Sequence, residues 1–267
     1  MEIPMNQVPV RSQIWSERPE PTNPFATRIA YCRGYDVYGD MLGKARWVDM
    51  LFLLFRGDRP SPSDASLLEA VAVALANPGP RDAAVHAAMC GGVGGSTAAS
   101  CLIAALAVGA GQNGGSREIF LAMENWVACG TDLDKWRHQL GFQNTDSSDI
   151  WPNAEHPPGF DPHGVGATTP VKQTLSYLAR LSSGPYLRWL EGNQPALEAA
   201  AAYPLALTGV TAAAWMDLGL TPEQGEMLHL LLRLPGAAAH ALEQRQYSHK
   251  HFPFFDVELL DDPQEKV

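Results

Sequence analysis

Apolar residues recur at three- and four-residue steps along most of the chain, the spacing that places side chains on one face of an α-helix. Two such segments have clear boundaries. The segment 61–64, Ser-Pro-Ser-Asp, combines an N-cap with a proline in the first turn, and the apolar stretch behind it ends before 77–80, Asn-Pro-Gly-Pro. A second helix opens at 221–223, Thr-Pro-Glu, and Pro235-Gly236 is expected to interrupt it.

The same spacing predicts further helices, and alanine, a strong helix former, fills many of their positions. These segments are 44–55, 82–89, 97–108, 117–128, 171–181, 195–202 and 210–218. We find no run of alternating β-branched residues that would predict a strand. Residues 1–26 are expected to form an extended arm, and residues 141–170, rich in Asp, Ser, Pro and Gly, a long functional loop. The pattern therefore predicts an all-α protein.

Charge and hydrophobic content narrow the functional classes. The 267 residues suffice for one large domain or for a large domain plus a smaller one; they are 46% hydrophobic, enough for a sizeable core, and carry a net charge of −10. Such a charge argues against a general nucleic-acid or anionic-membrane surface, because phosphate binding needs clustered positive charge. The continuous apolar run 98–110 is shorter than the roughly 20 residues of a membrane span. Without a secretory signal at its start, the chain is expected to be soluble and cytoplasmic.

No metal site or disulfide framework is predicted. The four cysteines (Cys32, Cys90, Cys101, Cys129) lack Cys-x-x-Cys spacing, so we expect buried free thiols. The segment 249–251, His-Lys-His, offers two imidazoles, but no third ligand lies near it in the sequence, which favours a solvated tail.

The segment 109–114, Gly-Ala-Gly-Gln-Asn-Gly, satisfies the dinucleotide pattern Gly-x-Gly-x-x-Gly. In that pattern the glycines form a turn between a strand and a helix, over the pyrophosphate. Here the preceding segment is Ala-rich and helical in pattern, so a tight turn between two helices is favoured over a nicotinamide site.

Five segments, in order, resemble the citrate synthase and citryl-CoA lyase superfamily. Arg33-Gly34-Tyr35-Asp36 and the Leu-Leu-Phe-Arg-Gly-Asp-Arg-Pro of 53–60 are similar to its Arg-Gly-Tyr turn and the helix ending in Leu-Leu-x-Gly-x-Leu-Pro. The segment 76–80, with His86 beyond it, resembles an Ala-Asp-His-Gly-Pro segment, and 109–115 resembles a Gly-Pro-x-His-Gly-Gly turn. The segment 158–160 resembles the start of a Pro-Gly-Phe-Gly-His loop, and 233–245 resembles a C-terminal Arg-x-x-Gly…His-x-Leu-Glu-Gln-Arg helix.

The resemblance covers about residues 27–250, and the short length is closest to the citryl-CoA lyase form. It implies an all-helical two-domain fold, with a large domain of residues 27–115 and 206–267 and a small domain of residues 116–205, after the arm of residues 1–26. It also implies a homodimer whose active site lies between the domains. Coenzyme A would enter as part of an acyl-CoA substrate, with no tightly bound cofactor.

The chain departs from the family at its catalytic positions. In the family an Asp is the base at the acyl-CoA α-carbon, and histidines stabilise the enolate and handle the second substrate's oxygen. Here Pro78 and Asn113 stand at two of the histidine positions, Pro162 stands at a third with His163 one residue later, and Thr208 stands at the position of the base. A threonine hydroxyl cannot take a proton at neutral pH without a base of its own.

Candidate site residues follow from the same alignment of motifs. The candidate catalytic residues are Asn113, Asp161, His163 and Thr208, and the candidate substrate-binding residues are His86, Gly114, Gly159, Phe160 and Arg233. Asn113 could donate a hydrogen bond to a thioester oxygen. Asp161 and His163 could replace the missing catalytic groups or be ordinary loop residues. Arg233 could bind a substrate carboxylate or form an ion pair at the surface.

Two functions from different classes remain after this step. The first is an enzyme that makes or cleaves a carbon–carbon bond in a CoA thioester, with an altered site and a substrate that need not be citrate. The second is a catalytically silent homologue that binds acyl-CoA or serves as a structural subunit beside an active paralogue.

Overall fold

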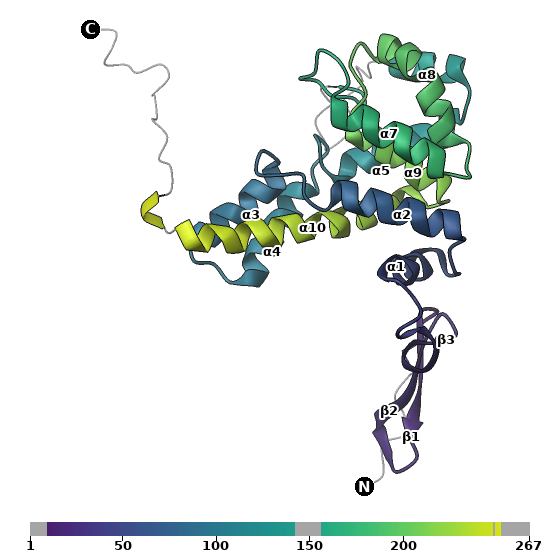
Figure 1. Ribbon diagram of the computed structural model, residues 1–267, viewed down its shortest axis with the longest axis vertical. Helices are drawn as coiled ribbons and strands as arrows, with labels where there is room; N and C mark the ends of the chain where they lie inside the picture. The colour runs from purple at the N-terminus through teal and green to yellow at the C-terminus, as the bar shows by residue number, and fades with distance from the viewer. Residues whose placement is uncertain (1–9, 142–155, 248, 252–267) are drawn as a thin grey trace. The chain divides into compact units, whose positions relative to one another are not determined.

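The computed structural model describes residues 10–141, 156–247 and 249–251, and these are mostly helical, as predicted (Figure 1). The α-helices are α1 (Trp47–Arg56), α2 (Pro62–Leu75), α3 (Ala83–Val93), α4 (Ala98–Gly109), α5 (Ser116–Cys129), α6 (Leu133–Gly141), α7 (Thr169–Leu181), α8 (Tyr186–Ala201), α9 (Leu207–Asp217) and α10 (Pro222–Tyr247). A π-helical turn spans Val37–Met41 and a 3-10 turn spans His249–His251. Part of the long loop expected at 141–170 lies outside the described residues.

A small antiparallel sheet precedes the helices, so the expectation of no strand was wrong. Strand β1 (Trp15–Glu20) pairs with β2 (Asn23–Cys32) from Trp15 opposite Cys32 to Glu20 opposite Asn23, and the short β3 (Tyr35–Asp36) follows. The expected extended arm, residues 1–26, therefore ends inside β2. Most of both long strands is exposed, so burial imposes no alternation of hydrophobic and polar residues on them. Pro19 lies at a register shift in β1, and a proline there makes the strand harder to recognise from sequence.

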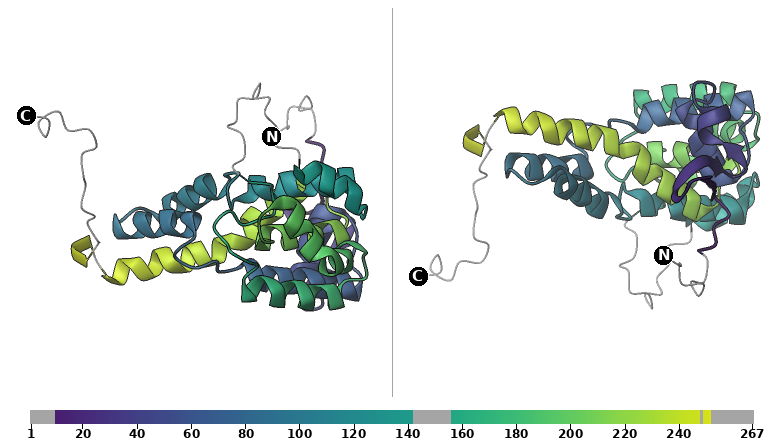
Figure 2. Two further views of the ribbon diagram at one scale, coloured as in Figure 1. Left: turned by 90° about the horizontal axis from the view of Figure 1, so that it is seen from above. Right: turned by 90° about the horizontal axis from the view of Figure 1, so that it is seen from below.

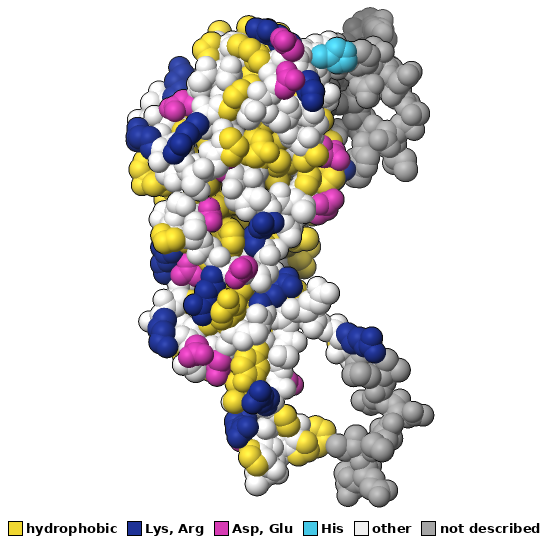
Figure 3. Space-filling model, turned by 90° about the vertical axis from the view of Figure 1, so that its right-hand side faces the viewer, with side chains coloured by type: hydrophobic (Ala, Val, Ile, Leu, Met, Phe, Trp, Pro, Cys, Tyr) yellow, Lys and Arg dark blue, Asp and Glu magenta, His cyan; other side chains and the backbone are white. Residues whose placement is uncertain are grey.

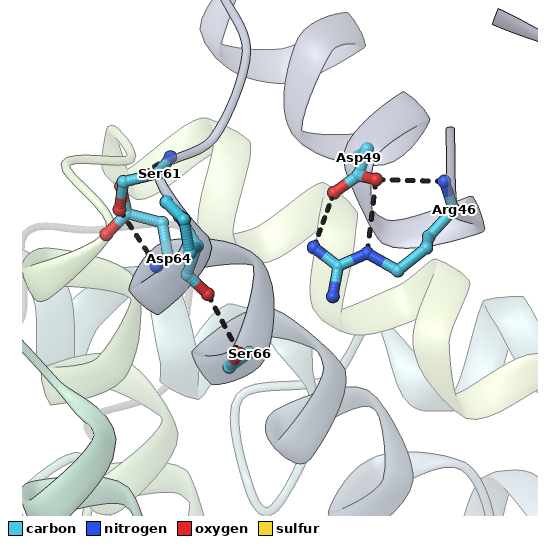
Figure 4. Close-up of polar contacts among 6 residues, drawn as sticks. Arg46, Asp49, Ser61, Asp64 and Ser66 are labelled. Atoms are coloured by element: carbon cyan, nitrogen blue, oxygen red, sulfur yellow. Dashed lines mark hydrogen bonds and ion pairs between the residues drawn. The ribbon is translucent and has the colours of Figure 1, made fainter. Parts of the chain in front are cut away.

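Side-chain caps fix the starts of the first two helices (Figure 4). In α1, Asp49 Oδ2 accepts hydrogen bonds from the backbone N–H of Arg46, at 2.8 Å, and from its guanidinium, at 3.1 Å. In α2, the N–H of Asp64 donates to Ser61 Oγ at 3.1 Å, and the Ser61 hydroxyl donates to Asp64 Oδ2 at 2.7 Å. These bonds satisfy donors that a helix N-terminus otherwise leaves unpaired, and the second cap confirms the prediction from residues 61–64.

Helix boundaries differ from the sequence-based expectation in three places. Helix α10 continues through Pro235, and the N–H of Gly236 donates to the Ala76 carbonyl at 2.7 Å. A partner outside the helix therefore takes up a donor at the point where the proline disturbs the helical pattern. Helix α8 contains Pro195 in its interior instead of starting there, and α6 had not been predicted.

The chain divides into two compact units, residues 1–75 with 111–231 and residues 76–110 with 232–267. In the second unit, α3 and α4 lie side by side along the C-terminal part of α10 (Figures 1 and 2). A cluster of small and apolar side chains forms its core: Val85, Ala88, Cys101, Ala105, Ala237 and Ala241. The division into a large and a small family-type domain, with the bounds given above, stays a prediction.

The first unit is centred on α5 and α9. Trp215 of α9 is fully buried, and Trp126 of α5 contacts the rings of Trp136 and Trp189 edge-on, at centroid distances of 4.7 and 5.7 Å. At the end of α9, Asp217 accepts hydrogen bonds from the backbone N–H groups of Tyr186 and Leu187, at 2.8 and 3.1 Å. The last residue of α9 thus supplies an anionic cap for the start of α8, which fixes α8 against α9.

Surface charge, helix hydropathy and the state of the cysteines can be compared with the expectations from composition. Basic and acidic side chains are interspersed over the described part of the face in Figure 3. Within the described residues, no helix is long and apolar enough to cross a membrane. All four cysteines are free thiols, but Cys90 is exposed, which corrects the expectation that all of them are buried.

Candidate functional site

The buried carboxylate of Glu118 lies where three of the segments identified in the sequence meet. Helix α5 begins at Ser116, directly after the glycine turn, and its first turn carries Glu118, whose exposure is 2%. Glu118 Oε2 accepts from the Gly114 N–H at 2.6 Å, and Oε1 accepts from the Gly159 N–H at 3.0 Å. A buried carboxylate needs such donors, since burying a charge without partners is costly.

Thr208 adds a third donor from the start of α9. Its Oγ1 donates to Glu118 Oε1 at 2.6 Å, although the two residues are 90 positions apart. Ala206 is the N-cap of α9, in an extended conformation, and its N–H donates to the Gly159 carbonyl at 2.9 Å. The turn before α5, the loop at Gly159 and the start of α9 therefore meet at one carboxylate.

Backbone contacts hold the Gly159 loop against α9. Phe160, only 3% exposed, forms an isolated antiparallel bridge with Leu205. Gly159, at φ +93°, and Gly209 approach so closely that a Cβ on Gly209 would lie 2.4 Å from the Gly159 carbonyl oxygen. No side chain fits between these two backbones, so this contact requires glycine on both sides.

His156 is the second buried ionisable side chain at this site. Its exposure is 7%, and its Nε2 lies 3.8 Å from Glu118 Oε2. Its ring also lies edge-on to Tyr203, with centroids 6.4 Å apart, and Nδ1 makes no hydrogen bond within the described residues. A carboxylate, a hydroxyl and an imidazole, the usual groups of proton-transfer chemistry, thus share one site.

The structure brings together some of the predicted site residues. Thr208, Gly114 and Gly159 all bond to Glu118, and Phe160 anchors the loop beside them. Asn113 is exposed next to Gly114.

Asp161 and His163 form a local turn in the loop that follows. The N–H of His163 donates to Asp161 Oδ1 at 2.9 Å, and the N–H of Asp161 donates to the Pro204 carbonyl at 2.8 Å. His163 is exposed and Asp161 is half-buried. Their predicted catalytic role stays a prediction.

Arg233 and His86 belong to the second compact unit. Arg233 forms an ion pair with Asp82, and both side chains are more than four-fifths buried, with exposures of 12% and 18%. Asp82 also accepts from the N–H groups of Ala84 and Val85 and so caps α3. The arginine thus already has a carboxylate partner within its own unit, and His86 is exposed on α3.

Sequence reasoning missed Glu118 and His156. A usable signal existed for Glu118, because it falls on the apolar stripe of its helix with Ile119, Ala122, Met123 and Trp126. A carboxylate on a buried stripe is rare unless it has dedicated partners. His156 is a lone histidine in a polar segment, and nothing in its local sequence indicates burial.

Two alternatives from the sequence are weakened. The segment 109–114 follows helix α4 and leads into α5, not from a strand into a helix, so the dinucleotide pattern lacks its structural context. Among the described residues, no cluster of three or more His, Cys, Asp or Glu side chains could hold a metal ion.

The chain has the citrate synthase-like fold of solved lyase structures. Citryl-CoA lyase from Hydrogenobacter thermophilus superposes with a TM-score of 0.71 at 17% identity, covering 96% of this chain and 98% of that one. ATP citrate lyase from Methanothrix soehngenii, in complex with citrate and coenzyme A, gives a TM-score of 0.73 at 16% identity, covering 100% of this chain and 44% of that one.

A mutant ATP citrate lyase from Methanosaeta concilii, in complex with (3S)-citryl-CoA, gives a TM-score of 0.72 at 15% identity, covering 100% of this chain and 43% of that one. This chain therefore spans less than half the length of these two ATP citrate lyases. No protein-family model and no curated protein sequence matches it. At these identities the structural similarity establishes the fold alone.

Proposed function

We propose that this protein makes or cleaves a carbon–carbon bond in a CoA thioester at the site around Glu118. The observation that carries the proposal is the meeting of three segments at this carboxylate. The glycine turn, the Pro-Gly-Phe loop and the start of α9 each resemble a substrate-handling segment of citryl-CoA lyases, and each donates a hydrogen bond to Glu118.

The groups at this site suit thioester chemistry. The exposed Asn113 carboxamide has N–H donors that can stabilise a thioester oxygen as it gains negative charge. The turn around Gly114 is exposed and bears no side chain there, so a bulky ligand can approach the backbone closely. The half-buried Asp161 is a candidate acid or base one residue beyond the Phe160 bridge.

Acyl-CoA is the proposed ligand, with coenzyme A as part of the substrate and no tightly bound cofactor. Of the proteins with this fold, one is in complex with citrate and coenzyme A and another with (3S)-citryl-CoA. The altered side chains of this chain make a substrate other than citrate the expected one.

We further propose a cytoplasmic homodimer, or a pair with an active paralogue. Residues 83–116 carry no formally charged side chain, and Ile103 and Val108 of α4 are 63% and 45% exposed. An exposed helix face that is apolar and uncharged is typical of a subunit interface.

The rival function is acyl-CoA binding without catalysis. It is favoured by one observation: Arg233, the predicted carboxylate-binding residue, forms an ion pair with Asp82 of its own chain. A silent homologue would keep the fold and the ligand and lose the chemistry.

Calorimetry and a turnover assay on the purified full chain separate the two functions. We expect coenzyme A to bind, and to raise the unfolding temperature because it binds the folded protein. Cleavage of (3S)-citryl-CoA, followed as release of a carbonyl product, supports the enzyme. Binding of coenzyme A without cleavage of this or any other β-hydroxyacyl-CoA thioester supports the silent homologue, and absence of both contradicts the proposed site.

A further inference from the structure

The contact between Thr208 and Glu118 has a defined direction. An ionised carboxylate only accepts hydrogen bonds, so the hydrogen in the 2.6 Å contact belongs to Thr208 Oγ1. The short distance is typical of a hydroxyl donating to a charged oxygen. With its hydrogen committed to Glu118, the threonine oxygen can offer only its lone pairs to a ligand.

The two side chains of this pair differ in their exposure to solvent. Glu118 is 2% exposed and its oxygens already accept from Gly114, Gly159 and Thr208, whereas Thr208 is half-buried and the neighbouring Asn113 and Gly114 are exposed. Of the two side chains of the pair, Thr208 is thus the more exposed and the one that a ligand can reach more readily. A proton that a ligand gives to Thr208 can pass on to Glu118 along the 2.6 Å contact.

We propose that Thr208 and Glu118 form a two-residue proton relay that replaces the missing aspartate base, and this inference rests on the proposed function. Thr208 is the catalytic residue that touches the substrate, and Glu118 is the acceptor behind it. A threonine hydroxyl becomes a competent acceptor when a base takes its own proton, and the structure supplies that base at hydrogen-bond distance.

The relay suits a hydroxyl proton better than a carbon-bound proton. Proton transfer is efficient between groups of similar acidity, and an alcohol substrate matches the threonine hydroxyl far more closely than a C–H bond does. The geometry therefore points to cleavage of a β-hydroxyacyl thioester.

The atoms and electrons of this step balance. The substrate hydroxyl gives its proton to Thr208 Oγ1 while the threonine proton passes to Glu118 Oε1. The electron pair left on the substrate oxygen forms a carbonyl, and the carbon–carbon bond breaks with its pair moving into the thioester enolate. The enolate carbon then takes a proton from solvent water, the proton on Glu118 returns to solvent, and a carbonyl compound and an acyl-CoA leave without any change of oxidation state overall.

The test uses four single variants and one double variant of the full chain, with (3S)-citryl-CoA as the probe and coenzyme A binding as a check on folding. We expect Thr208→Val to lower kcat roughly a hundredfold or more, the usual contribution of general acid–base catalysis, with coenzyme A affinity retained. Thr208→Ser should restore kcat to within about tenfold of wild type, since it restores the hydroxyl. A residue that only shapes the loop would not give this pattern of loss and rescue.

Thr211→Val is the matched control. Thr211 lies on the same helix, its hydroxyl donates to the Leu207 carbonyl at 2.8 Å, and it does not bond to Glu118. The control variant removes a buried threonine hydroxyl from α9 without touching the relay, so its kcat should equal that of the wild type. Glu118→Gln is the fourth variant, and combined with Thr208→Val it should lower kcat no further than either change alone, because the two groups act as one unit.

The outcomes separate the relay from the proposed function. Wild-type cleavage that survives Thr208→Val, or multiplicative losses in the double variant, would overturn the relay and leave the enzyme in place. Failure of the wild type to cleave (3S)-citryl-CoA and other β-hydroxyacyl-CoA thioesters, while coenzyme A still binds, would overturn the enzyme and the relay together.

Discussion

The carboxylate of Asp82 contacts the guanidinium of Arg233 with one oxygen and caps helix α3 with the other. Because both side chains are largely buried, removal of either leaves a charge with poor access to water. We expect Asp82→Ala to lower the free energy of unfolding by about 2–4 kcal/mol, from loss of the cap and of the pair. Urea unfolding of the purified variant measures this.

Arg137→Ala is the control for that variant. Arg137 pairs with Asp134 at 2.9 Å, but both side chains are exposed, so its loss should change stability by less than about 0.5 kcal/mol. Equal effects of the two substitutions would contradict a stabilising role for Asp82 in the pair and the cap.

The Asp49 cap of helix α1 makes stability depend on acid pH. The hydrogen bond from the Arg46 side chain holds the pKa of Asp49 below its usual value. The folded state therefore binds this proton less readily than the unfolded state does, and the contribution is present above the ordinary aspartate pKa, about 3.9, and is lost as pH falls through the lowered value.

Asp49→Asn should consequently lower stability at neutral pH, by less than about 1 kcal/mol because the Arg46 side chain is half exposed and solvent screens the pair. The difference from wild type should vanish once the pH is below the folded-state pKa of Asp49. Thermal unfolding of both proteins across the range from neutral to strongly acidic pH gives the comparison. A difference that grows toward low pH would contradict this assignment.

Ordinary citrate synthase turnover is expected to be absent or very low with acetyl-CoA and oxaloacetate. The histidine and aspartate positions of the resembled motifs hold Pro78, Pro162 and Thr208, and several lost acid–base groups should leave little rate. Thiol release with these two substrates is the measurement. Robust turnover that persists in Asp161→Ala and His163→Ala would show that the motifs were matched to the wrong positions.

Thiol labelling should distinguish Cys90 from two of the buried cysteines. Cys90 is exposed, whereas burial raises the pKa of Cys32 and of Cys129 and so depletes their reactive thiolates. With iodoacetamide at pH 8 under native conditions, mass spectrometry should find Cys90 modified well before these two. Early modification of Cys129 would mean that α5 opens readily, and Cys90→Ser provides the blank.

Helices were predictable where the sequence carries local stop and start signals. The Ser61 cap and the break after Leu75 act within one helical turn, so they can be recognised without tertiary information. The β1–β2 hairpin was not predictable in the same way, because its strands are largely exposed and backbone pairing alone defines them. Pro235 failed as a helix breaker because the bond from Gly236 to Ala76 depends on a segment far away in the sequence.

The residues of the candidate site show the same difference between local sequence motifs and tertiary contacts. Thr208, Gly114 and Gly159 could be singled out because each lies in a short motif, and their functional roles stay predictions. Glu118 was overlooked, because its importance lies in three donors contributed by distant segments. Local sequence reports which side chains are present, whereas the assignment of a buried charge to its partners is a tertiary property.

The backbone contact between Gly159 and Gly209 bears on how such a protein can diverge. A β-carbon at position 209 would collide with the opposite carbonyl, so neither position can explore other residues without pushing the loop away from α9. Asn113 and His163 nearby are exposed, so exchange of their side chains need not displace this frame. A chain at 17% identity to citryl-CoA lyase can therefore keep its fold.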